Sequence, residues 1–142
     1  APRREELSTY KLGQSTPLLS PTGGMKISAT DLAKYMMMHM NYGKAGKVKI
    51  ISKKSSKQMQ TPLSDEEGYG LALLKTNDLI EGKTLTGHTG SAYGLYSAMF
   101  FDPKEKFGIV LITNGANGKL QKGFRVVSRE TLQILYNNLI KN

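Results

Sequence analysis

The run from Gly87 to Ser91, which reads Gly-His-Thr-Gly-Ser, holds the side chains of this sequence that are best suited to chemistry. An ordinary imidazole has a pKa of about 6.5, so a histidine at position 88 would be only partly charged at neutral pH. The Thr89 hydroxyl can donate a hydrogen bond to a carboxylate, and Gly90 lets another backbone approach closely. The run is therefore the candidate binding site of this chain.

Strands must position this run. Four segments have strand-like content, at 69–74, 84–88, 96–101 and 107–113. The last two should pair as a hairpin around 102–106, whose proline and charges suit a turn. Because 107–112 is almost continuously apolar, both of its faces should be covered, as in the middle of a helix-sheet-helix sandwich.

Two helices should precede the sheet. Residues 28–31 have the pattern of a capping box, with Asp31 where Glu or Gln is commoner, and Gly43 would end this first helix. A second, short helix should run from Ser52 as its N-cap to about Gln60 and place Met59 inward. The buried face of the first helix is predicted to consist of Leu32, Tyr35, Met36, His39 and Met40.

A closing helix should follow the sheet, from Gly123 to about Ile140. Its broad apolar stripe would pack on the sheet. The stripe is predicted to consist of Phe124, Val127, Ile134, Leu135 and Leu139.

Composition narrows the function classes. The 142 residues fit one domain, carry a net charge of +9 and include no cysteine. Without cysteine, the chain has no disulfides, no thiolate chemistry and no cysteine-based metal sites. The longest apolar run, 109–112, is far short of the ~20 residues that a bilayer requires, so no membrane span is expected.

Six lysines lie in one window that has no acidic residue: Lys44, Lys47, Lys49, Lys53, Lys54 and Lys57. Such a charge run could meet nucleic acid. However, the window has neither an arginine nor an aromatic residue, which nucleic-acid readers generally use. We therefore expect a solvated basic face and no nucleic-acid partner. The positive charge would also favour an anionic substrate or envelope surface.

Several segments, in their order along the chain, together resemble the β-lactamase and penicillin-binding-protein family of serine hydrolases. They are Pro-Thr-Gly-Gly at 21–24 with Asp-Leu-Ala at 31–33, Tyr-Gly-Leu at 69–71, His-Thr-Gly at 88–90, Asp-Pro at 102–103 and Thr-Asn-Gly at 113–115. The His-Thr-Gly form is similar to the class C and esterase-like branch. The resemblance covers 21–142 and follows an irregular segment at 1–20. It implies an α/β (α+β) fold, with an antiparallel β-sheet flanked by helices, as the C-terminal part of a β-lactamase-like helix-sheet-helix sandwich.

The resemblance also implies roles for the His-Thr-Gly run. The N–H of Ser91 would be one oxyanion donor in an acyl-enzyme mechanism, and His88 would replace the lysine of stricter penicillin binders. Thr89 and Gly90 would bind the substrate. That substrate would be a β-lactam, a D-amino-acid peptide or a small ester, with a broader esterase or peptidase favoured over a dedicated penicillinase. No cofactor is expected.

The family also needs Ser-x-x-Lys and then Tyr-x-Asn upstream of this run. Residues 8–11 and 136–138 carry these letters in the wrong order and context, so we interpret them as surface or packing residues. We therefore expect a chain that lacks the nucleophile and the N-terminal part of the fold, and that is inactive alone. Its open sheet edge would favour self-association. By the family's habit we expect a bacterial periplasmic, cell-envelope or secreted location.

Other interpretations compete with this one. Gly87, Gly90 and Gly94 could be turn and bulge glycines. His39 and His88 could be imagined as metal ligands, but no third ligand accompanies them, so no metal is expected. The protein could be a non-catalytic relative that binds a peptide or peptidoglycan. It could also be a basic scaffold, whose binding to nucleic acid or an acidic surface would weaken steeply with salt.

Overall fold

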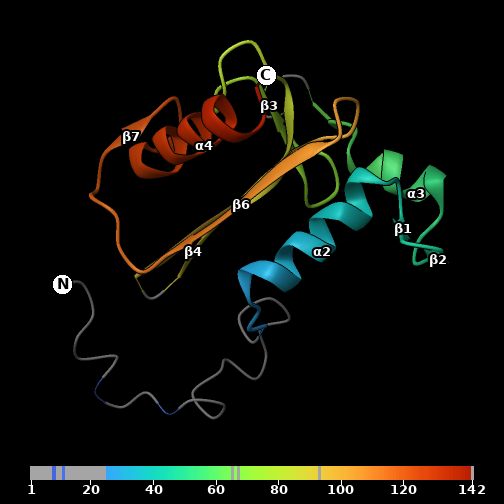
Figure 1. The fold of residues 1–142 in the computed structure, drawn as a ribbon, viewed down its shortest axis with the longest axis horizontal. Helices are drawn as coiled ribbons and strands as arrows, with labels where there is room; N and C mark the ends of the chain where they lie inside the picture. Colours follow the sequence, from blue (N-terminus) through green and yellow to red (C-terminus); the bar gives the residue numbers. More distant parts are fainter. Residues whose placement is uncertain are drawn as a thin grey trace.

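The computed structural model describes residues 8, 11, 25–64, 66, 68–92 and 94–141. Two helices come first, a four-stranded sheet follows, and one helix closes the chain (Figure 1). This is the order that the sequence predicts. The irregular segment expected at 1–20 and the Pro-Thr-Gly-Gly turn at 21–24 lie outside the described residues, apart from residues 8 and 11.

The sheet is antiparallel, with the strand order β3-β4-β5-β6. Its strands are β3 (Leu74–Thr76), β4 (Leu85–Ala92), β5 (Leu95–Asp102) and β6 (Phe107–Thr113). β6 has the predicted bounds, and β5 is one residue longer at each end. β4 extends four residues beyond its predicted end at His88, so the whole His-Thr-Gly-Ser run lies on a strand.

The strand predicted at 69–74 is wrong. Tyr69 forms only an isolated bridge with Leu74, and the chain between them turns, with Ala72 at a φ of 61°. Gly70 lies so close to the end of α3 that a Cβ there would be 2.4 Å from the carbonyl oxygen of Met59. The apolar residues of this segment therefore form a tight loop, and β3 begins only at the last residue of the segment, Leu74.

Helices cover both faces of the sheet. Figure 1 shows β6 between α4 (Val126–Leu139) and α2 (Ala29–Met40). Side chains of β5 alternate, with Ala98 and Phe100 in the core cluster that contains α4 residues and Met99 and Phe101 in the cluster that contains α2 residues. The predicted helix-sheet-helix sandwich and the mixed α+β class are confirmed.

Helix α2 begins as predicted. The Ser28 hydroxyl accepts a hydrogen bond from the N–H of Asp31 at 3.1 Å and donates to its carboxylate at 2.8 Å. Asn41 caps the other end, two residues before Gly43, whose φ is 91°. The predicted inward position of Tyr35 is wrong, because its side chain is 45% exposed and lies edge-on over the His39 ring at the helix rim.

The buried residues of α2 are Met36, Met38, His39 and Met40. Met38 is the one that the helical spacing missed. Gly108 on β6 makes room for α2, because a Cβ at this position would lie 2.6 Å from the Met36 side chain. The methionines therefore fill the space over the sheet, as their flexible side chains allow.

Helix α3 (Lys53–Met59) has Ser52 as its N-cap and Gln60 as its C-cap, as predicted. The Gln60 amide donates to the carbonyl of His39 at 2.8 Å and so ties α3 to the end of α2. A small hairpin precedes α3, formed by β1 (Lys44–Ala45) and β2 (Val48–Lys49). This hairpin was not expected from the sequence.

The closing helix starts later than predicted, because residues 120–125 form a second small hairpin. Its strands are β7 (Leu120–Gln121) and β8 (Phe124–Arg125). The buried residues of α4 are Ser128, Leu132 and Tyr136. Ile134 and Leu139, predicted to face inward, are 59% and 75% exposed. The face of α4 that packs on the sheet therefore differs from the predicted apolar stripe, and on this face Tyr136 packs against Phe107.

Candidate functional site

The His-Thr-Gly-Ser run lies on the part of β4 that β3 does not reach. β3 pairs with β4 only as far as Gly87, whereas β5 pairs with β4 through Ala92. In the described part of the chain, residues 88–92 therefore have a strand neighbour on one side only. Backbone groups on such an edge are free to meet a ligand, as an oxyanion hole requires.

A cleft of about 120 Å³ adjoins this free segment. Thr89, Gly90 and Ser91 of β4 line it together with the start of α4. The hydroxyl-bearing side chains of Thr89 and Ser91 are exposed, so they can reach a bound molecule. Tyr96 and Ser97 of β5 also line the cleft, as do Arg125 and Ser128.

Arg125 is the residue of this cleft that the sequence analysis missed. Its guanidinium lies over the Tyr96 ring, 4.9 Å from the ring centre, and it makes no side-chain cap for α4. A guanidinium stays charged at any physiological pH and suits a carboxylate. Arg125 and Thr89 are far apart in the sequence, and no local motif joins them, so only the fold reveals that they share a cleft.

His88 lies apart from this cleft. It is opposite Met99 in the β4–β5 register, whereas Thr89 is opposite Ala98. Adjacent residues of a strand point to opposite faces, so His88 faces the α2 side of the sheet and Thr89 faces the α4 side. The imidazole lies edge-on against the Tyr69 ring, with centres 5.9 Å apart, and its Nδ1 donates to the carbonyl of Thr89.

The three glycines around the run have different structural roles. A Cβ on Gly87 would lie 1.9 Å from the carbonyl oxygen of Met99, so this glycine is needed for the close approach of β5. A Cβ on Gly90 would meet only the Ser97 hydroxyl, at 2.4 Å. Gly94 has a φ of 82° in the turn between β4 and β5. Gly87 and Gly94 thus fit the packing and turn interpretation, while Gly90 also lines the cleft.

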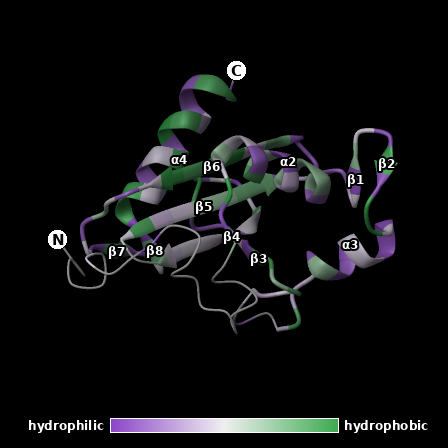
Figure 2. Cartoon of the chain, turned by 90° about the horizontal axis from the view of Figure 1, so that it is seen from below, coloured by the Kyte–Doolittle hydropathy of each residue, from purple (hydrophilic) through white to green (hydrophobic). Residues whose placement is uncertain are grey.

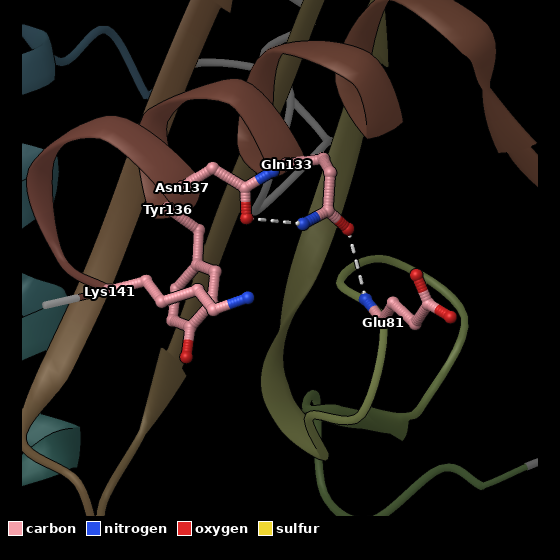
Figure 3. Close-up of a pocket in the computed structure, with 5 residues that line it drawn as sticks. All are labelled: Glu81, Gln133, Tyr136, Asn137 and Lys141. Carbon is pink, nitrogen blue, oxygen red and sulfur yellow. Dashed lines mark hydrogen bonds between the residues drawn. The ribbon is translucent and has the colours of Figure 1, made fainter.

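A larger cavity of about 310 Å³ lies between α4 and the loop that precedes β4. Figure 3 shows that Gln133 spans one side of it, accepting from the Glu81 N–H and donating to the Asn137 side chain, both at 3.0 Å. Tyr136 and Lys141 complete the lining. The side-chain amide of Gln133 thus holds the loop against the helix, so we interpret this cavity as part of the packing between them and not as a binding site.

The fold does not support a catalytic role for the Ser-x-x-Lys match at 8–11 or the Tyr-x-Asn match at 136–138. Tyr136 is 7% exposed and belongs to the core, as the packing interpretation predicts. Ser8 and Lys11 are exposed, but their neighbours lie outside the described residues. Within the described ranges, no group of three potential metal ligands occurs, and no helix is long and apolar enough to cross a bilayer.

Comparison with protein-family models matches residues 1–128 to the family described as Beta-lactamase. The match starts upstream of the resemblance seen from residue 21 and stops within the first turn of α4. No curated protein and no solved structure matched the chain. Because the family match covers most of the 142 residues, this chain belongs to the Beta-lactamase family.

Proposed function

We propose that this chain supplies the oxyanion strand and the substrate-binding wall of a serine acyl hydrolase. The proposed substrate class is a β-lactam, a D-amino-acid peptide or a small ester, and the proposed branch is the class C and esterase-like one, which the His-Thr-Gly run at 88–90 favours. The supporting observation is the cleft in which Thr89, Gly90 and Ser91, on an open strand edge, lie together with Arg125. Family membership supplies the reaction type.

Each cleft residue has a distinct role in this proposal. The backbone N–H of Ser91 donates to the oxyanion that forms when the substrate carbonyl is attacked. The Thr89 hydroxyl and the Arg125 guanidinium bind the substrate carboxylate, which fixes the carbonyl against the strand. Gly90 lines the cleft with its backbone, and a side chain at this position would point to the opposite face of the strand, beside Ser97.

His88 acts from the other face of the strand. Its Nδ1 donates to the Thr89 carbonyl, which leaves Nε2 as an acceptor. In this arrangement His88 holds the peptide between Thr89 and Gly90 in position and accepts a hydrogen bond at the strand edge. The attacking serine and its base come from a part of the fold outside this cleft, so the 142-residue chain alone is inactive.

Amide chemical shifts of the chain during titration with an acyl-D-Ala-D-Ala peptide test this proposal. The amides of residues 89–91 should shift, and the affinity should fall at least tenfold in Thr89→Val and Arg125→Gln. Thr84→Val is the matched control, because Thr84 is exposed just before β4 and away from the cleft. Shifts confined to the cavity around Gln133, or equal effects of all three variants, would contradict the proposal.

A non-catalytic relative that binds peptide or peptidoglycan is the second candidate. The observation that favours it is the lining of the cleft, whose described residues include no lysine to activate a serine. Both candidates predict peptide binding at 89–91. They differ in activity when this chain is combined with the N-terminal part of the same fold, which would carry the Ser-x-x-Lys segment. Only the hydrolase would then hydrolyse the substrate.

Two parts of the proposal concern location and assembly. Export to the bacterial periplasm, the cell envelope or the medium follows the habit of the family. Self-association follows from β6, which in the described sheet pairs with β5 on one side only and is half-buried along most of its length. A second copy or the N-terminal part of the fold would pair with this edge.

A further inference from the structure

One end of the molecule is strongly basic. The hairpin β1–β2 carries Lys44, Lys47 and Lys49, and α3 carries Lys53, Lys54 and Lys57, all of them exposed. We call these six residues the basic end. Figures 1 and 2 both show the hairpin and α3 together at one end of the fold, with β7 at the other. The charge run of the sequence is thus gathered on one surface.

Among the residues that the structure describes, no carboxylate forms a salt bridge with the basic end. The salt bridges of the described residues are Lys34–Asp31, Lys83–Glu105 and Lys122–Asp78, and none of them uses a lysine of the basic end. Instead, the ammonium groups of Lys53 and Lys57 lie 6.0 and 5.6 Å from the centre of the Tyr42 ring. Lys106, from the turn after β5, adds a third at 5.5 Å. Like charges held this close favour an external anion.

The same surface exposes apolar side chains. Val48 is 60% exposed and Ile50 is 57% exposed, and in the sequence they alternate with Lys47 and Lys49. Gly46, at a φ of 59°, makes the tight turn that brings this sequence to the hairpin tip. Exposed aliphatic residues interleaved with lysine suit the boundary between lipid headgroups and acyl chains.

Nucleic acid fits the basic end less well. The basic end has no arginine to contact guanine or to fork onto phosphate. The nearest aromatic ring, Tyr42, is surrounded by ammonium groups and only half-exposed, so it offers no open face to a base. Neither Val48 nor Ile50 would gain a partner on a sugar-phosphate backbone.

We propose that the basic end docks this protein onto an anionic lipid bilayer. The six lysines meet the headgroup charge, and Val48 and Ile50 enter the interface beneath it. This surface is separate from the cleft on β4, so the inference does not depend on the proposed hydrolase function. It gives the protein a peripheral membrane location without a membrane-spanning helix.

Sedimentation of the 142-residue chain with lipid vesicles tests this inference. The chain should bind vesicles that contain phosphatidylglycerol, not vesicles of phosphatidylcholine alone, and binding should weaken as salt is raised. The triple variant K44Q/K47Q/K49Q should lose on the order of 100-fold in partitioning, because each lysine near the surface contributes about fivefold. V48S/I50S should weaken binding while keeping its salt dependence.

The matched control is K75Q/K119Q/K141Q, which removes three exposed lysines outside the basic end and so changes net charge equally. It should retain nearly all of the binding. The inference would be overturned by equal losses in the two triple variants, by no binding to anionic vesicles, or by equal binding to neutral ones. It would also be overturned if duplex DNA displaced the vesicles and V48S/I50S had no effect. Circular dichroism confirms that each variant is folded.

Discussion

The packing of β4 on β5 gives a quantitative prediction for the His-Thr-Gly strand. In Gly90→Ala the new methyl would lie 2.4 Å from the Ser97 Oγ but 3.8 Å from the Ser97 Cβ. Only the hydroxyl is in the way, and it can rotate about χ1 at modest cost. We expect a loss of about 1 kcal/mol in the free energy of unfolding, at the low end for an overpacked site.

The double variant Gly90→Ala/Ser97→Ala should recover this loss. With the hydroxyl gone, the nearest remaining atom of residue 97 is at an ordinary contact distance of 3.8 Å. A double-mutant cycle should therefore give a coupling free energy of about 1 kcal/mol between the two positions. Gly87→Ala has no such rescue, because its methyl would meet the Met99 carbonyl and the Phe100 Cα, which are backbone atoms. We expect it to cost about 3 kcal/mol or more.

Urea unfolding measures all of these variants by the shift in the midpoint at constant slope. Gly115→Ala sets the baseline, because Gly115 has open space around it and no positive φ. Zero coupling between residues 90 and 97, or a Gly87→Ala variant as stable as Gly115→Ala, would refute the register of β4 on β5.

Three further predictions concern other parts of the fold. Burial lowers the pKa of His39, whose two ring nitrogens have no hydrogen-bond partner in the described part of the chain. The unfolded chain therefore binds this proton first as pH falls, so His39 should lower the free energy of unfolding from about pH 6.5 down to its lower folded pKa. In pH-dependent urea titrations His39→Leu should lose that part of the pH dependence, and an unchanged profile would contradict the assignment. Asp102→Ala should lower the free energy of unfolding by about 1–2 kcal/mol, because the Asp102 carboxylate accepts hydrogen bonds from the N–H groups of residues 104 and 105 at 2.7 and 3.1 Å. Asp102→Asn keeps an acceptor and should cost less. Equal urea midpoints for the two variants would contradict this role of Asp102 in the turn. Light scattering should show the wild-type chain to be oligomeric through the open edge of β6 and Ile112→Lys to be more monomeric, and a monomeric wild type would argue against edge pairing.

The sequence predicted the elements that carry strong local signals. Ser28 and Ser52 each cap a helix where expected, because a hydroxyl at this position binds a backbone N–H within the next turn. The apolar run of β6 correctly implied cover on both faces. These features depend on neighbours in the chain, which is why the sequence alone shows them.

The errors arose where contacts between distant residues decide the structure. Residues 69–74 have strand-like content, yet a hydrogen bond from the Leu71 N–H to the Met59 carbonyl at the end of α3, and another from the Leu63 N–H to the Tyr69 carbonyl, hold this segment in a loop. The inward face of α4 is set by its packing on Phe107 and not by its most apolar stripe. The candidate site shows the same limit, since Arg125 joins Thr89 only through the packing of α4 on the sheet.

Intact-mass spectrometry after incubation with a fluorophosphonate and, separately, with a penicillin tests most directly whether this chain carries the wall of the site and not its nucleophile. Both reagents trap a reactive serine covalently. The account predicts an unchanged mass for the 142-residue chain with either reagent. A single adduct mapped to Ser8, Ser91 or another serine of this chain would contradict it and would show that the chain holds a complete catalytic centre.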